Sequence, residues 1–296
     1  TPMLIGIGCL GLGYAFRVLR WAVILDSPDT AVSFRDCAPH YMSAIALNNL
    51  LPLRAGDVVR SFVFPKYMGI TKTWSLSSLV AERLFDPVVL LLFLVLGSYL
   101  GASGALPGEV RAALPWVSAL TLAGFLATFV LATPIASLAR SLAGGVSSGA
   151  LQTLLNALAD MLTALRVVLS PGRFALTALL TLLVWMFEAG LFFWAMEAAN
   201  LSAGVGLAMF VTAVATIATL VPSTPGYVGT FHLAVLVALS AIEATPEQAG
   251  AFALVVHFAL WGCTTLVGVL FIFSHPVLRE RLTFRRGETE ESFSGE

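Results

Sequence analysis

Two short stretches of this sequence combine residues suited to holding a ligand with breaks in strongly apolar runs. The first stretch, residues 48–60, carries Asn49, Arg54, Asp57 and Arg60. Arginine binds phosphate oxygens bidentately and stays charged at any pH, so Arg54 and Arg60 can hold an anionic group while Asp57 orients them. The alternative is a position at a membrane interface, where they would meet lipid headgroups. We favour ligand binding, because charges at membrane depth are costly and tend to mark a pathway.

The second stretch, residues 220–232, has a similar break without the acidic and basic side chains. Pro52 and Gly56 of the first stretch recur as Pro222 and Gly226, at a constant offset of 170 residues. Paired segments interrupted by glycine and proline in the two halves of an apolar chain indicate a transporter with inverted repeats. In the second stretch Pro222, Pro225, Gly226 and Gly229 shape the backbone, and Ser223, Thr224 and Tyr227 add hydroxyl groups that can contact a ligand.

Four more charged residues lie in apolar surroundings. Glu82 and Asp86 are spaced to share a helix face, and Arg83 is close enough to pair with Asp86. These three either cap a cavity as a charge cluster or pair near the lipid headgroups. Glu188 lies deep inside its apolar run, so we expect it to be buried. A buried carboxylate can be protonated, which makes Glu188 the best candidate for coupling to a proton or cation.

The composition places these residues in a membrane. Of 296 residues, 58% are hydrophobic and 11% are charged, and the mean hydropathy is +0.91, whereas about a quarter of a soluble domain is charged. The sequence has no glycine-rich phosphate loop and no H-E-x-x-H or Gly-x-Ser-x-Gly motif. Its three cysteines are too far apart for a disulfide framework or a zinc site. We therefore expect no enzyme activity, no cofactor, no metal and no nucleic-acid partner.

Five full spans and two short hairpins account for the apolar segments, which predicts an all-α polytopic membrane protein. The predicted spans are residues 2–25, 76–100, 113–133, 174–197 and 248–273. The apolar arms around each break are too short to cross a bilayer, which predicts two re-entrant, Pro/Gly-broken helical hairpins buried in protein or lining a wet cavity. The first span carries Arg17, Arg20 and Trp21, which we interpret as a cationic and aromatic edge at an interface.

The cations in loops and at helix edges predict the orientation and the domains. In this threading the first hairpin enters and leaves the membrane on one side, and the second hairpin enters and leaves on the opposite side. All but one of the cations then lie on the side of the first hairpin. By the positive-inside rule this side, which also holds the C-terminus, is cytoplasmic. Residues 1–133 then hold the first repeat and the first helix of the second, residues 134–173 form a cytoplasmic amphipathic linker, residues 174–274 complete the second repeat, and residues 275–296 form a charged cytoplasmic tail. The second repeat has one helix more, so we expect a further helix before Thr1, six spans in the complete protein and inverted-topology repeats.

Three motifs, in order, carry a resemblance to a known family. Residues 49–60, 82–86 and 222–231 resemble the lysylphosphatidylglycerol synthase transmembrane-region family, also grouped as flippase-like integral membrane proteins. Asp57 stands where the family more often has glutamate, and His232 stands where many members have glutamate, which weakens the transfer of a coupling role to that position. In multidomain members the membrane part looks like a lipid translocase, and aminoacyl transfer belongs to a soluble domain. The resemblance therefore implies a lipid class and no aminoacyl-lipid synthesis here.

Together, the motifs and the resemblance predict a multi-pass lipid translocase of a bacterial-type plasma (inner) membrane. It would move a phospholipid, aminoacyl-lipid, hopanoid or polyprenyl-linked amphiphile between leaflets, and the headgroup would meet Arg54 and Arg60 between the hairpins. The alternative is a non-transporting membrane partner that anchors or presents lipid to a separate lipid-modifying or glycosyl transferase. A membrane-embedded enzyme with Glu82 and Asp86 as its acid pair ranks third, because nothing supplies a nucleophile or metal beside them.

Overall fold

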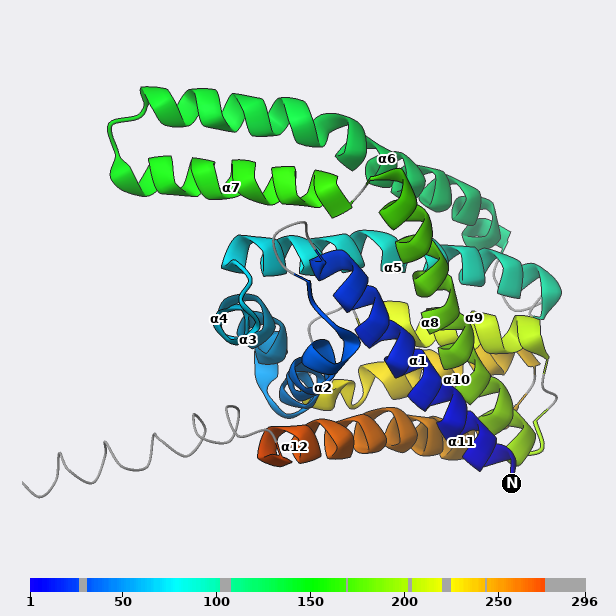
Figure 1. Cartoon of the computed structure of the whole chain (residues 1–296). Helices are drawn as coiled ribbons and strands as arrows, with labels where there is room; N and C mark the ends of the chain where they lie inside the picture. Colours follow the sequence, from blue (N-terminus) through cyan, green and yellow to red (C-terminus); the bar gives the residue numbers. More distant parts are fainter. Residues whose placement is uncertain are drawn as a thin grey trace, which may run out of the picture.

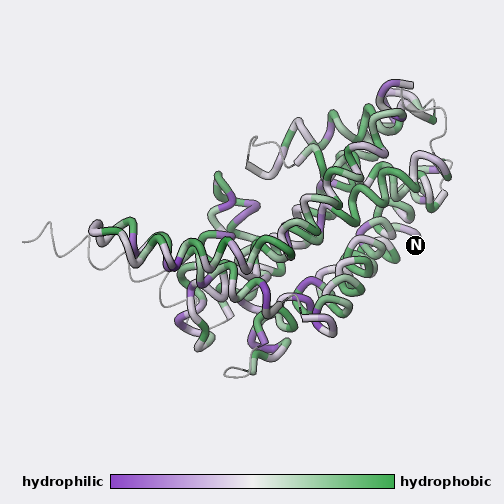
Figure 2. Tube along the Cα trace, turned by 90° about the horizontal axis from the view of Figure 1, so that it is seen from above, coloured by the Kyte–Doolittle hydropathy of each residue, from purple (hydrophilic) through white to green (hydrophobic). Residues whose placement is uncertain are grey.

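The chain folds into helices, as its apolar runs predict. A computed structural model describes residues 1–26, 31–101, 108–168, 170–201, 204–219, 225–242 and 244–274, and no strand occurs in these ranges (Figure 1). Helices satisfy their own backbone hydrogen bonds, which is the condition for crossing a bilayer. Hydrophobic residues run along most of the helices, and hydrophilic residues gather in short stretches (Figure 2).

Within the described ranges, four helical segments are long and apolar enough to cross a membrane. They belong to α1 (Pro2–Leu25), α6 (Gly108–Gly145), α8 (Pro171–Ala198) and the continuous run of α11 (Pro246–Phe258) and α12 (Thr264–Ser274), which a π-helical turn, Ala259–Cys263, connects. The fifth span expected from the sequence corresponds to α5 (Lys72–Leu100). This helix is long enough to cross, but it is not among the four, and it carries Lys72, Glu82, Arg83 and Asp86.

Each break joins short helices that pack on one another. Around the first break lie α2 (Phe34–Leu50), a 3-10 turn (Pro52–Arg54), α3 (Ala55–Phe62) and α4 (Pro65–Met68). Around the second lie α9 (Val205–Ala218), a 3-10 turn (Pro225–Tyr227), α10 (Thr230–Leu239) and a last 3-10 turn (Ser240–Ile242). The helix α3 packs on α2, and α10 packs on α9, so the helices on the two sides of each break lie against one another.

Glycines allow the long helices to approach closely. The helix α1 packs along α8, α5 along α9, and α12 along α2. A Cβ on Gly97 of α5 would lie 2.6 Å from the Phe210 backbone nitrogen of α9, and a Cβ on Gly268 of α12 would lie 2.2 Å from the Met42 carbonyl oxygen of α2. No larger residue fits at either crossing without moving backbone, as is usual where helices associate through small residues.

The predicted linker, residues 134–173, is divided between two helices. The helix α6 continues through Pro134, and α7 (Gly149–Val168) packs back against its last turns to form an arm beside the bundle (Figure 1). Part of the apolar stripe of α7 is covered by protein, since Ala159 and Leu162 pack against Ala136 and Ala139 of α6. The stripe is therefore partly occupied by a neighbouring helix before any lipid is considered.

The largest apolar core lies among α8, α9, α10 and α11. Phe192 of α8 sits at its centre, with ring centroids 6.3 Å from those of Phe231 in α10 and Phe252 in α11. Between α1, α3 and α5 the interior is instead occupied by charged side chains.

Candidate functional site

The first break turns the chain sharply at residues 52–54. Leu53 and Arg54 adopt left-handed backbone conformations, with φ of 58° and 53°, a region that costs a non-glycine residue about 1 kcal/mol or more. Just after the turn, a Cβ on Gly56 would lie 1.9 Å from the Ala44 carbonyl oxygen of α2. Glycine at this position is therefore what lets α3 pack directly on α2.

The second break has the same backbone feature with different side chains. Gly226 and Tyr227 are consecutive left-handed residues with φ of 69° and 58°, and Gly229 has φ of 95°. A Cβ on Gly226 would lie 2.9 Å from Trp261 Nε1, so the turn presses against the indole ring. The predicted ligand-contacting and backbone-shaping residues Ser223, Thr224 and Pro222 lie outside the described residues.

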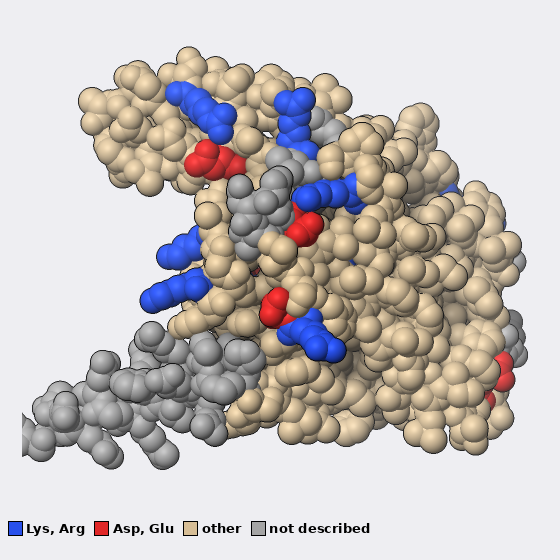
Figure 3. Space-filling view, viewed as in Figure 1, with Lys and Arg blue, Asp and Glu red and all other residues tan. Residues whose placement is uncertain are grey.

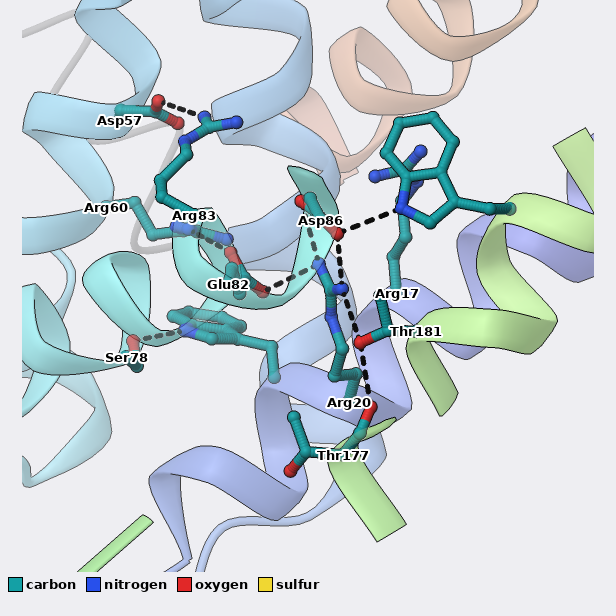
Figure 4. Close-up of polar contacts among 12 residues, drawn as sticks. Arg17, Arg20, Asp57, Arg60, Ser78, Glu82, Arg83, Asp86, Thr177 and Thr181 are labelled. Atoms are coloured by element: carbon teal, nitrogen blue, oxygen red, sulfur yellow. Dashed lines mark hydrogen bonds and ion pairs between the residues drawn. The ribbon is translucent and has the colours of Figure 1, made fainter. Parts of the chain in front are cut away.

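A chain of buried ion pairs joins α1, α3 and α5 (Figure 4). Arg60 Nη2 lies 2.5 Å from Glu82 Oε2, and Arg20 Nη1 lies 2.6 Å from Asp86 Oδ1. The chain is completed where Arg20 Nη2 lies 3.8 Å from Glu82 Oε1. Arg20, Arg60 and Glu82 are at most 3% exposed, and an unpaired buried charge costs several kcal/mol. Each of these side chains therefore depends on its partners.

Asp57 and Arg83 extend the cluster toward its exposed edge. Arg83 Nη2 donates to Asp57 Oδ2 at 2.7 Å, and Asn48 fixes the same carboxylate by donating from Nδ2 to Oδ1 at 2.9 Å. The pairing of Arg83 with Asp86 expected from their spacing is therefore wrong. Arg83 reaches the first break instead, and Asp86 is held by Arg20.

The interpretation of Arg17, Arg20 and Trp21 as an interfacial edge is also wrong. Arg20 and Trp21 are fully buried, and Trp21 Nε1 donates to Ser78 Oγ at 3.0 Å. The guanidinium of Arg60 lies 5.2 Å from the Trp21 ring, within cation–π range. The physical reason is the presence of buried carboxylates on α5 and α8, with which Arg20 and Arg17 form ion pairs.

Arg17 is the cation that leaves this cluster and faces α8. Its Nη2 lies 2.5 Å from Glu188 Oε2, and its guanidinium lies 4.6 Å from the Trp185 ring. Trp185 Nε1 in turn donates to Asp86 at 3.1 Å, so the Arg17–Glu188 pair is mechanically connected to the ion-pair chain.

A cavity of about 190 Å³ opens beside the Arg17–Glu188 pair. Both breaks reach it, through Asn49 from the first and through Gly226 and Tyr227 from the second. Apart from Leu260, the remaining walls are aromatic or carry hydroxyl groups: Tyr14, Trp185, Phe231, His257, Trp261, Thr216, Thr219 and Thr264. Asn49 is held in place because its side-chain amide donates to Thr264 and Thr265, and its carbonyl accepts from Trp261 Nε1.

The predicted site residues thus form two groups. Asp57, Arg60, Glu82, Arg83 and Asp86 take part in ion pairs and surround a small internal space of about 60 Å³. Asn49, Glu188, Gly226 and Tyr227 line the larger cavity. Sequence reasoning missed Arg17 and Arg20, although the excess of carboxylates over arginines in α5 and α8 was a signal that further cations had to be buried nearby.

Arg54 belongs to neither group and bridges the two breaks. Its Nη2 donates to the Thr219 carbonyl oxygen at 3.2 Å, and its guanidinium lies 5.8 Å from the Tyr227 ring. No carboxylate among the described residues forms an ion pair with Arg54. Its charge is thus available to a ligand at the cavity edge.

The described residues contain no cluster of three or more histidine, cysteine or acidic side chains placed to hold a metal ion. The stacked rings of His232 and His257, 4.7 Å apart, give two such side chains next to the cavity. A pair is one or two ligands short of the usual protein site for a transition metal.

Comparisons with known proteins give a family and nothing more specific. No curated protein and no solved structure matches the chain. A family model described as the lysylphosphatidylglycerol synthase TM region matches residues 2–268. Since this match extends over both breaks and every residue that lines the cavity, the chain belongs to the lysylphosphatidylglycerol synthase transmembrane-region family.

Proposed function

We propose that the protein is a lipid translocase and that a lipid headgroup passes through the cavity beside Arg17 and Glu188. The observation that carries this proposal is a polar cavity inside an apolar helical bundle, reached by both breaks. Irregular backbone at membrane depth is tolerated where it is buried in protein or lines a water-filled cavity. Half-helix ends and broken helices are also the parts from which transporters build substrate sites.

Internal symmetry in the packing supports the inverted repeats. Arg17 and Glu188 are 171 residues apart, and the same separation relates Gly97, which packs on the second hairpin, to Gly268, which packs on the first. The helix after each hairpin therefore packs on the opposite hairpin, and the helices that precede the hairpins, α1 and α8, pack on one another. An exchange of the two halves would preserve this pattern, as an inverted repeat requires.

The exposed charges support one orientation in the membrane. The exposed basic residues Lys66, Lys72, Arg140 and Arg166 lie on α4, the start of α5 and the α6–α7 arm, and basic side chains gather at this end in Figure 3. At the opposite helix ends lie the exposed acidic residues Glu109, Glu197 and Glu247, with Arg111 as the one cation of the described residues at the start of α6. By the positive-inside rule the basic end is cytoplasmic. The first hairpin is then re-entrant from the cytoplasm and the second from outside.

The cavity chemistry indicates how an anionic headgroup would be held. A phosphate that enters can accept hydrogen bonds from Arg17 in place of Glu188 and meet Arg54 at the cavity edge, because guanidinium groups bind phosphate oxygens bidentately. Glu188 would then be free to pair with a cationic part of the headgroup or to take up a proton. Arg60, expected from sequence to share this role, is held by Glu82, so we assign it to the closed half of the pathway.

The test is transport of fluorescent phosphatidylglycerol in proteoliposomes, read by quenching of the outer leaflet. Removal of both charges in an Arg17→Gln, Glu188→Gln variant leaves no unpaired partner, so the fold should persist while flux falls by about tenfold or more, equal to about 1.4 kcal/mol at the barrier. The matched control removes the exposed ion pair of Arg140 and Asp160, whose atoms lie 3.3 Å apart, and should leave flux unchanged. Wild-type protein that moves neither anionic, zwitterionic nor polyprenyl-linked lipids would overturn the proposal.

A non-transporting partner of a lipid-modifying transferase is a second candidate, favoured by the α6–α7 arm. The arm projects beside the bundle (Figure 1), and Leu138, Leu142, Leu151 and Leu154 on it are 44–65% exposed. Exposed leucines on a projecting arm can serve a protein contact as well as a lipid contact. Only a translocase requires Arg17 and Glu188 for flux, so the proteoliposome experiment separates the two functions.

A further inference from the structure

An apolar groove of about 300 Å³ lies beside the polar cavity, between α1, α2 and α12. Its walls include Leu10 and Gly11 of α1, Phe34 and Met42 of α2, and Val267 and Phe271 of α12. A Cβ on Gly11 would meet no atom within 4 Å, so this part of the groove is open space. None of the groove residues belongs to the charged cluster or to either break.

The groove and the cavity are adjacent and share part of their walls. Tyr14 and Thr264 line both, so one hydroxyl-bearing residue from α1 and one from α12 stand where the polar and apolar spaces meet. The groove side is walled by hydrocarbon, on which water finds few hydrogen-bond partners. A polar space beside an apolar one, with two hydroxyl-bearing residues between them, matches the order of headgroup, polar linkage and hydrocarbon tail in an amphiphile.

The equivalent place in the other half of the molecule is filled. There α5 packs directly on α8, whereas α12 makes no comparable contact with α1. Leu90 and Phe93 of α5 pack with Trp185 of α8 in one buried apolar cluster. The opening between α1 and α12 is thus a feature of one half only.

We propose that this groove binds one hydrocarbon chain of the lipid whose headgroup occupies the cavity, and that the opening between α1 and α12 admits the lipid from the bilayer. This inference rests on the proposed function. The occupant is chosen because the two spaces share a wall, since a tail in the groove places its own headgroup beside Tyr14 and Thr264. The tail then stays in hydrocarbon while the headgroup crosses.

The experiment uses vesicles of phosphatidylethanolamine and phosphatidylglycerol that contain phosphatidylglycerol with a photoreactive diazirine in one acyl chain. After illumination, mass spectrometry maps the adducts on the full-length chain. Adducts should be denser on Phe34, Met42 and Phe271 than on Leu120, an outward residue of α6 that is 75% exposed and reports ordinary lipid contact.

Two pairs of variants make the test specific. Gly11→Leu fills the groove, whereas Gly8→Leu adds the same side chain to another open position of α1 that lines neither space. From the opposite wall, Val267→Phe fills the groove and Leu266→Phe does not. The groove adducts should drop several-fold in Gly11→Leu and Val267→Phe and stay unchanged in their controls.

The proposal that the groove binds a lipid tail would be overturned if adducts are no denser in the groove than at Leu120, or if they persist in both filling variants. This readout needs no transport, so its failure is distinct from failure of the proposed function. Groove adducts in a protein that shows no lipid flux would support the lipid site and contradict the translocase function. Lipid flux with a uniform distribution of adducts would support the translocase function and contradict the groove as a lipid site.

Discussion

The two halves of the proposed inverted repeat differ in the side chains that lie between their helices. In the first half, Arg60, Glu82 and Asp86 form a buried ionic cluster with Arg20. A shift by 171 residues, the separation of Arg17 and Glu188, places Phe231, Ala253 and His257 at the equivalent positions. Phe231 and Ala253 belong to the large apolar core, and the Phe231 and His257 rings lie 5.2 Å apart. Ion pairs therefore occupy these positions in the first half, and packed rings and apolar side chains occupy them in the second.

This difference explains why the cavity lies on one side. Ion pairs at 2.5 and 2.6 Å draw α1, α3 and α5 together and leave only a small space among them. The equivalent positions of the second half attract no opposite charge, and the cavity remains open next to Glu188 and Tyr227. In an alternating mechanism the ionic half would open in turn, with Arg20 and Arg60 exchanging carboxylates for a headgroup phosphate.

The largest expected loss of stability comes from replacing one residue of the ionic cluster with the residue type at the equivalent position of the second half. Glu82→Ala leaves Arg20 and Arg60 buried without a shared carboxylate, and loss of one partner of a buried pair costs about 3–5 kcal/mol. We expect a strongly lowered melting temperature of the detergent-solubilised protein, or failure to accumulate. Arg140→Gln is the matched control, because the side chains of Arg140 and its partner Asp160 are 53% and 60% exposed and exposed pairs contribute about 1 kcal/mol or less. Equal stability of the two variants would contradict the closed ionic half.

A smaller effect is expected from the glycines of the two breaks. Gly56→Ala places a methyl group against a backbone carbonyl that cannot rotate away, so α3 must separate from α2, at an expected cost of about 1–3 kcal/mol typical of overpacking. Gly226→Ala meets the Trp261 ring and a left-handed φ of 69°, which costs about 1 kcal/mol. The melting temperature of Gly56→Ala should therefore be lower than that of Gly226→Ala. Gly144→Ala, which adds a methyl in open space, should match the wild type.

The sequence predicted the helices more accurately than it predicted the ion-pair partners of the charged side chains. All-helical membrane architecture and family membership are confirmed, because apolar runs and ordered motifs are local properties. The partner of Arg83 was mistaken, because a three-residue spacing reports proximity along one helix, while Asp57 arrives from another element. Arg20 looked like an edge residue because it lies near the end of its span, and only the packing of α5 and α8 around it reveals the burial.

Substitution of Arg54 is expected to have the smallest effect on stability. It should also distinguish most sharply between the two halves. This residue bridges the breaks through the Thr219 carbonyl and the Tyr227 ring and forms no ion pair with any described carboxylate. Arg54→Gln can keep one hydrogen bond to Thr219, so the melting temperature should change by no more than the equivalent of about 0.5 kcal/mol. If the free charge meets a headgroup phosphate, flux of phosphatidylglycerol should fall several-fold while flux of a neutral glycolipid stays the same. Rising salt should weaken wild-type transport of the anionic lipid toward the level of the variant, since exposed charges are screened. Equal loss for anionic and neutral lipids would assign Arg54 to holding the two breaks together instead of to the headgroup.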